Sequence, residues 1–276
     1  MTFSMISNAA SLGAQKSFMS TQNALGRSIG RLSSGLRIQS AADDAAGMGI
    51  SSVMTADIRS VAQAERNAND AISMIQIAEG ALNEQSNIMS RLRELAIQSA
   101  NGALSGNERA FIEVEHQQLV SEMDRIAAVT EFNSYSMLGP DAGTYSMQVG
   151  KDAVAGIDTI DITFTASDAP SLGVNAMDFT TVGGAQAALG TIDTAIAALS
   201  ANRSDLGASQ NRLEVTISNL RVEEQNLTAA NSRIKDVDVA RETAILTRNQ
   251  IMSQAGTAML AQANQLPQAA LQLLGQ

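Results

Sequence analysis

The sequence predicts a mainly α-helical chain, in which long helices form an antiparallel coiled-coil rod that carries a small β-hairpin insertion. Three observations predict this fold class. Apolar residues recur at steps of three and four over two long segments. Aromatic residues make up only 3% of the 276 positions, and Ala, Leu, Ile and Met, which suit slender helix pairs, carry most of the apolar content. Strand-like alternation is confined to one Gly-rich segment.

Both ends of the chain are amphipathic and poor in charge. Residues 1–42 contain basic side chains but no acidic one, and no charged side chain follows Arg248. An organelle transit peptide would explain an acid-free start, but it would not explain the uncharged, Gln- and Ala-rich segment 249–276. A thin rod cannot bury such apolar stripes within one molecule, so we expect both ends to pack against a partner surface.

The first long helix is expected from about Asp57 to Ser99, and Asn101-Gly102 ends it. Its apolar seam has the spacing of a coiled coil. Gln85 is the one polar position in that seam, and it is either a register-setting residue or a tolerated defect. The seam consists of Val61, Ala64, Ala68, Ala71, Ile75, Ala78, Leu82, Gln85, Met89, Leu92 and Ala96.

A shorter helix is expected over 107–130, and a second long helix follows the Gly-rich segment. The packed side of the shorter helix is predicted to hold Phe111, Val114, Leu119, Met123 and Ile126. The second long helix carries a heptad row, which consists of Ile192, Leu199, Leu206, Leu213, Leu220, Leu227 and Ile234.

The segment 132–190 is predicted to hold the β-hairpin. Alternating residues, Tyr145-Met147-Val149 and Ile160-Ile162-Phe164, indicate its two strands, with a turn within 150–156. The residues that follow, TASDAPSLGVNAMDFTTVGG, are rich in Ser, Thr and Gly, which favours an exposed loop.

Enzymatic chemistry finds little support in the residues. Cys is absent, and His116 is the only histidine, so neither a thiol nucleophile nor an HExxH zinc motif can form. On its predicted helix, His116 is expected at the surface or in an interface. Asp43-Asp44 fits a helix cap near Ser40 better than a metal or acid/base pair. We therefore expect no enzyme, no cofactor and no metal. The net charge of -10 also argues against a nucleic-acid partner.

Three motifs carry a resemblance to a known family. They are LSSGLRIQSAADDAAGMGIS at Leu32 to Ser51, RLRELAIQSANG at Arg91 to Gly102, and QAGTAMLAQANQLPQAALQLL at Gln254 to Leu274. Together, and in this order, they resemble bacterial flagellins of a short form that lacks large outer domains. The resemblance covers roughly two thirds of the chain, namely both termini and the central helices.

The resemblance implies a domain organisation. Residues 1–42 with 235–276 would form a terminal-helix domain that lines the filament channel. Residues 43–234 would form the outer helical rod, with the hairpin and loop insertion at about 132–190. The filament-core packing residues would be Leu25, Ile29, Leu32, Leu36, Ile251, Met259, Leu260, Leu266, Leu271 and Leu274.

The resemblance also implies a function, which is that of a structural subunit of the bacterial flagellar filament. Such a subunit is exported unfolded, without a cleaved signal, and self-assembles outside the cell into a hollow helical tube for swimming. Its partners would be identical or related subunits, an export chaperone, the filament cap and hook-filament junction proteins. The alternative within the family is a hook-filament junction protein. A peripheral membrane protein is disfavoured because the C-terminal segment lacks basic residues and bulky Trp or Phe anchors.

Two further sites follow from the resemblance. In similar flagellins, positions that match Arg91, Leu95 and Glu115 are read by Toll-like receptor 5 of vertebrate hosts, so the free subunit is expected to activate this receptor. Without a receptor, Arg91 and Glu115 would form an exposed salt link, and Leu95 would pack between subunits.

The Ser and Thr residues of the 159–181 region lie where some family members are O-glycosylated, although exposure alone also explains them.

Overall fold

The computed structural model describes residues 8–152, 154 and 156–274, with the backbone alone from 266 onward. These residues fall into two compact units. The first takes in the chain up to Ala56 and from Asn226 onward, and the second comprises Asp57–Gln225. Helix predominates in both units, which confirms the predicted fold class.

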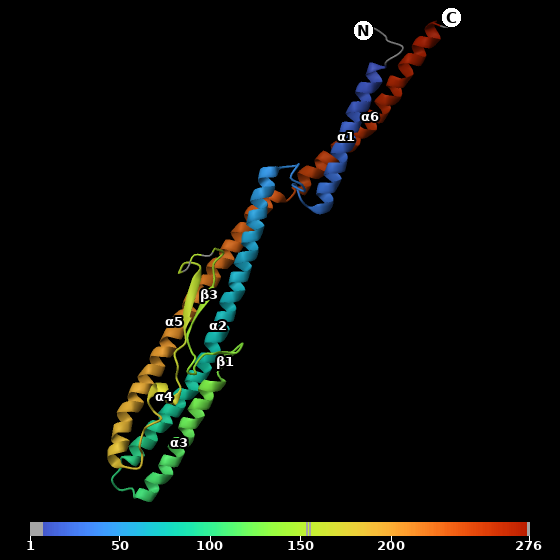
Figure 1. Ribbon diagram of the computed structural model, residues 1–276. Coiled ribbons are helices and arrows are strands. Elements are labelled where there is room, and N and C mark those ends of the chain that lie inside the picture. The colour runs from blue at the N-terminus through green and yellow to red at the C-terminus, as the bar shows by residue number, and fades with distance from the viewer. Residues whose placement is uncertain (1–7, 153, 155, 275–276) are drawn as a thin grey trace. The chain divides into compact units, whose positions relative to one another are not determined.

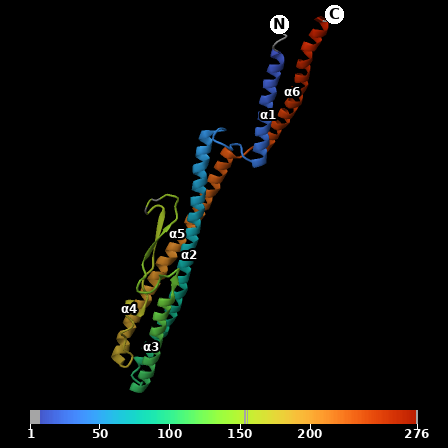
Figure 2. The same ribbon diagram turned by 45° about the vertical axis from the view of Figure 1, so that its right-hand side comes forward.

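In the first unit, α1 (Ala9–Ser34) and α6 (Val239–Leu274) lie side by side, as Figures 1 and 2 show. The amide of Asn8 donates to the carbonyl of Ala263 over 2.9 Å, while Arg31 faces Glu242 near the other end of the pair. The two helices are therefore antiparallel. Asn8 also caps α1 by accepting from the Ser11 N–H, and Gly35 ends it in the left-handed conformation.

The chain leaves α1 through a turn that Asp43 organises. One Asp43 oxygen accepts hydrogen bonds from the backbone N–H groups of Gln39 and Ser40, at 3.2 and 3.1 Å. The neighbouring Asp44 accepts from the N–H of Gly47. Asp43 therefore fixes the turn before α2, and Asp44, directly before the first residue of α2, caps that helix.

The second unit is built on α2 (Ala45–Ser99), α3 (Gly106–Val129) and α5 (Val182–Lys235). The whole predicted seam of α2 from Val61 to Ala96 is buried, which confirms the coiled-coil interpretation. The heptad row of α5 is buried from Ile192 to Leu220, and its last two members, Leu227 and Ile234, are half-buried.

Gln85 is not a defect in that seam. Its side chain is buried, and its amide nitrogen donates to the carbonyls of Ser167 at 3.1 Å and Met123 at 3.4 Å. The polar position therefore links three parts of the chain, because α2 carries the donor while α3 and the segment before α4 supply the acceptors.

The predicted packed face of α3 is wrong in part. Phe111 is 76% exposed and Val114 also faces solvent, whereas Met123 is buried as expected. The face of α3 that packs against the core carries the polar residues Arg109 and His116 in place of Phe111 and Val114. Its buried residues are Arg109, Ile112, His116, Met123 and Ala127.

The predicted β-hairpin is confirmed. Strands β3 (Thr144–Gln148) and β4 (Thr159–Thr163) pair antiparallel, with Tyr145 opposite Ile162. A smaller pair, β1 (Glu131–Phe132) and β2 (Tyr135–Ser136), was not predicted. It turns at Asn133 and Ser134, which both have positive φ.

The segment after β4 is not an exposed loop. It includes the short helix α4 (Ala169–Leu172), and it buries Val174 and Phe179 completely. We call residues 165–181 the strap, because they pack against the helices of the second unit before α5 begins. The sequence prediction failed here because the few apolar residues of the strap lie among many small polar ones.

Candidate interaction surfaces

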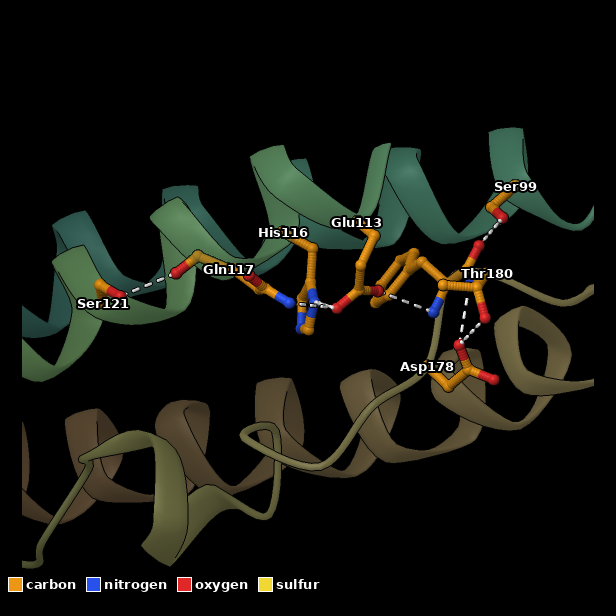
Figure 3. A network of polar contacts seen from close by, with 8 residues as sticks. Ser99, Glu113, His116, Gln117, Ser121, Asp178 and Thr180 are labelled. Carbon is orange, nitrogen blue, oxygen red and sulfur yellow. Dashed lines mark hydrogen bonds and ion pairs between the residues drawn. The ribbon is translucent and has the colours of Figure 1, made fainter. Parts of the chain in front are cut away.

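The polar groups of the second unit form a structural network around His116, which Figure 3 shows. His116 is only 2% exposed, and its ring stacks on Phe179 with centroids 4.4 Å apart. The expected surface position of His116 is therefore wrong. A histidine at helical spacing among charged neighbours suggests exposure, but here the strap covers the ring.

The strap is fixed on both sides of Phe179 by hydrogen bonds. One Glu113 oxygen accepts a hydrogen bond from the N–H of Phe179 at 3.0 Å. The hydroxyl of Ser99 donates to the carbonyl of Phe179 at 2.5 Å. The other Glu113 oxygen accepts from Gln117 and lies 3.4 Å from Nδ1 of His116. The hydroxyl of Ser99 is thus engaged by the backbone, and no serine in this network faces the histidine as a nucleophile would.

Among the described residues, no group of three or more His, Asp and Glu side chains is placed to hold a metal ion. The best-formed hollows are open grooves. One of them, about 390 Å³, lies between α1 and α6 and is lined mainly by small and apolar residues such as Ala14, Phe18, Gly256 and Met259. These features suit packing between helices.

Arg91 and Glu115 form the exposed ion pair that the sequence suggested. The guanidinium of Arg91 donates from Nε and Nη2 to one Glu115 oxygen, at 2.9 and 2.7 Å, and from Nη1 to Glu94 at 2.9 Å. The hydrogen bonds to Glu115, which contribute most, and the one to Glu94 raise the pKa of Arg91 above its ordinary value. The pair joins α2 to α3 at the surface and presents one cation between two carboxylates.

Leu95 differs from Arg91 and Glu115 because its side chain is buried. Its side chain is 1% exposed and belongs to the apolar core of the second unit. The expectation that Leu95 packs between subunits is therefore corrected, since the side chain already packs within its own chain. It supports the surface that carries Arg91 and Glu115, one helical turn from Arg91.

The paired terminal helices leave large apolar side chains in contact with solvent. Among the expected packing residues, Ile29, Ile251 and Met259 are exposed, Met259 by 62%. The exposed set on α1 and α6 also includes residues that the sequence interpretation did not single out, which are Leu12, Met19, Val239 and Met252. A helical-wheel projection would have placed Leu12 and Met19, which lie seven positions apart, on the same side of α1.

The other expected packing residues have different places. The half-buried ones, which partly face the same chain, are Leu25, Leu32, Leu36 and Leu260. The side chains of Leu266, Leu271 and Leu274 lie outside the described residues. Each helix of the pair therefore has one side that its partner covers and another that it leaves open.

By length and composition alone, α5 contains a stretch apolar enough to cross a membrane. The Ile and Leu row of this helix is buried in the second unit between Ile192 and Leu220. Packing against the other helices of that unit accounts for these apolar residues.

Family models match both ends of the chain. Residues 6–141 match the bacterial flagellin N-terminal helical region, and residues 189–274 match the bacterial flagellin C-terminal helical region. Between the two matches lie β3, β4 and the whole strap, where the sequence differs most from the helical pattern.

Individual relatives agree with the family models. A flagellin of Halalkalibacterium halodurans is 46% identical over 267 residues, which cover 97% of this chain and 98% of the relative. The flagellar filament 33 kDa core protein of Treponema phagedenis is 41% identical over 283 residues, again covering 97% and 98%. The crystal structure of Bacillus cereus flagellin superposes with a TM-score of 0.51 at 30% identity, over 60% of this chain and 94% of that one. Long paired helices, apolar open faces at the two ends and these matches agree, and the chain belongs to the bacterial flagellin family.

Proposed function

We propose that this flagellin assembles into a hollow helical tube through the apolar faces that α1 and α6 leave open. As a member of its family, the chain is a structural subunit of the bacterial flagellar filament and not an enzyme. The tube would transmit rotation at its base as thrust for swimming. The observation that supports this mode of assembly is the row of exposed Leu, Ile and Met side chains on the paired terminal helices.

Exposed apolar side chains of this size cost free energy in water, and burial against neighbouring copies recovers about 25 cal/mol for each Å² removed from solvent. Contacts between two different faces of identical copies build a helical filament when the rotation from copy to copy does not close into a ring. The uncharged end of α6 allows close approach, since no charged side chain follows Arg248 and none would need to be desolvated.

The same proposal includes the route to the cell exterior and the partners met on the way. The subunit would pass through a type III export channel in an unfolded state and become part of the extracellular filament. A chain without Cys supports this route, because no disulfide can resist unfolding. The expected partners are an export chaperone that covers the apolar ends, the filament cap and hook-filament junction proteins.

The alternative of a hook-filament junction protein is not favoured. The relatives that match nearly the whole chain are named as a flagellin and as a filament core protein, and both matches extend over 97% of the sequence. A filament subunit that polymerises into long filaments is therefore favoured over a junction protein.

We also propose that Toll-like receptor 5 of vertebrate hosts reads the released subunit at Arg91 and Glu115. The exposed, charge-dense pair on α2 and α3 supports direct contact with a receptor. Leu95 would act indirectly, because its buried side chain holds α2 in the position that presents Arg91. We propose O-glycosylation at exposed hydroxyls of the strap such as that of Ser171, and an intact-mass measurement on native filaments tests it.

The assembly proposal is tested by Met259→Asp, which places a charge on the open face of α6. Seeded polymerisation is followed by electron microscopy, with circular dichroism as a check on folding. Wild-type protein should form long tubes, and Met259→Asp should remain as folded single subunits. Ser204→Asp is the matched control, because Ser204 is an exposed polar position in the second unit and should tolerate the charge. Long tubes grown from Met259→Asp protein would show that assembly uses another surface.

A further inference from the structure

The turn between α2 and α3 contains Asn101-Gly102 at an exposed position. Asn101 is exposed, and its Oδ1 accepts a hydrogen bond from the N–H of Ala103 at 3.1 Å. The space around Gly102 is open, since a Cβ built there would meet no atom within 4 Å. Within the part of the chain that the structure describes, the N–H of Gly102 has no hydrogen-bond acceptor.

We propose that Asn101 is a site of spontaneous deamidation in the folded subunit. The backbone nitrogen of Gly102 loses its proton and attacks Cγ of Asn101. The new C–N bond closes a five-membered imide, while the bond from Cγ to Nδ2 breaks and ammonia leaves with the proton. Water then opens either carbonyl of the imide. One opening gives aspartate, and the other gives isoaspartate, in which the main chain runs through the former side chain.

Three features of the turn favour this reaction. Glycine offers no side chain to hinder the attack of its own nitrogen. The N–H of Ala103 points at Oδ1, the oxygen on which negative charge develops as Gly102 attacks, so the turn stabilises the intermediate as an oxyanion hole does. Solvent reaches the site, which supplies both the base and the water that the steps consume.

Asn231, which precedes Ser232, provides the contrast within the same chain. It lies inside α5, where the N–H of the following residue is engaged in the helix. Its carboxamide is held by two neighbours, since Ser51 donates to its Oδ1 at 2.7 Å and its Nδ2 donates to Thr55 at 3.3 Å. Deamidation at Asn231 should therefore require unfolding.

The modification would change the end of α2. The buried guanidinium of Arg109 donates to the carbonyls of Ser99 at 3.0 Å and Asn101 at 2.8 Å. An isoaspartate adds one carbon to the main chain and displaces the Asn101 carbonyl from this clamp. Aspartate keeps the backbone length and adds only a charge, so Asn101→Asp separates the two effects.

The test incubates the folded protein at mildly alkaline pH, followed by trypsin digestion and mass spectrometry with chromatographic separation of isoaspartate. Cleavage after Arg93 and Arg109 gives peptide 94–109, which holds Asn101 and Asn107, and cleavage after Arg221 and Arg233 gives peptide 222–233, which holds Asn226 and Asn231. Fragment ions of each peptide locate the modified residue. The first peptide should gain a deamidated form with time, mainly isoaspartate, while the second stays unchanged. In Gly102→Ala protein, this gain should be lost.

Two outcomes would overturn the proposal. One is a peptide 94–109 that changes only after the protein is unfolded in urea, because the folded turn would then protect Asn101. The other is a wild-type rate in Gly102→Ala, verified as folded by circular dichroism, because the open space at residue 102 would then not control the attack on Asn101.

Discussion

The hydroxyl of Ser99 donates a hydrogen bond to the carbonyl of Phe179, although the two residues lie 80 positions apart in the sequence. Ser99 is the last residue of α2, and Phe179 lies in the strap just before α5. Arg109 of α3 donates to the carbonyl of the same Ser99. Ser99 therefore joins α2, α3 and the strap through contacts that are all buried.

Phe179→Ala should destabilise the second unit strongly. Phe179 is fully buried against His116, so removal of its ring leaves a cavity, and such changes cost about 3–5 kcal/mol. Denaturant unfolding followed by circular dichroism measures the loss. Phe111→Ala is the matched control, because that ring is exposed on α3 and its removal should change stability by less than about 0.5 kcal/mol. Equal losses in the two variants would contradict the assigned packing.

Glu108 should make the stability of the second unit depend on acid. It completes the capping box of α3 by accepting from the N–H of Ser105 at 2.7 Å, and this bond, more than the nearby Arg109, lowers the pKa of its carboxyl below the ordinary value. Because the folded-state pKa is the lower one, the stabilisation is present above the unfolded pKa and is lost as pH falls through the folded pKa.

Glu108→Gln should therefore be less stable than wild type at neutral pH, and the difference should shrink below about pH 4, where the unfolded carboxyl is protonated. Urea unfolding over a pH series measures both curves. Ser105→Ala, which removes the other half of the box, should be less stable at every pH and serves for comparison. A difference between Glu108→Gln and wild type that is independent of pH would rule out the charged cap.

Much of the fold could be predicted because long helices repeat one signal many times. The seam from Val61 to Ala96 and the row from Ile192 to Leu220 each place many residues on one face, so a single irregular position does not change the result. The hairpin followed from alternation in two short runs. The two-residue strands around Asn133 were missed, since a pairing that short leaves almost no pattern.

The errors share a physical cause. Phe111 and Val114 are apolar but exposed, while His116 is polar but buried. Each buried polar group gains a hydrogen bond or a stacking partner from the strap or a neighbouring helix, and a sequence pattern does not contain those partners. Leu95 was assigned to contacts between subunits for the same reason, because nothing in the local sequence shows which copy supplies its neighbours.

Gly256 should be needed for close contact between α1 and α6. A Cβ at this position would lie 3.1 Å from the ring of Phe18, so the larger side chain of Gly256→Val should displace this ring and weaken the contact between the two helices. The variant should show weaker helical signal under assembly conditions and slower seeded growth. Gly26→Ala tests the opposite case, because Gly26 of α1 has open space around it and alanine favours a helix by about 1 kcal/mol. Normal growth of Gly256→Val filaments would mean that the terminal pair tolerates a wider separation.

Arg91→Ala should abolish or strongly reduce activation of Toll-like receptor 5 by the free subunit, measured in a reporter cell line. The change removes the cation that holds Glu115 and Glu94, but it leaves the core beneath it unchanged, so circular dichroism should match wild type. Leu95→Ala should also reduce the response, but together with a stability loss of about 2–5 kcal/mol, because its side chain is buried.

Arg125→Ala is the control, since Arg125 forms a comparable exposed pair with Glu122 elsewhere on α3. A full response from both Arg91→Ala and Leu95→Ala would remove this surface from receptor recognition, whereas loss in Leu95→Ala alone would assign the effect to folding.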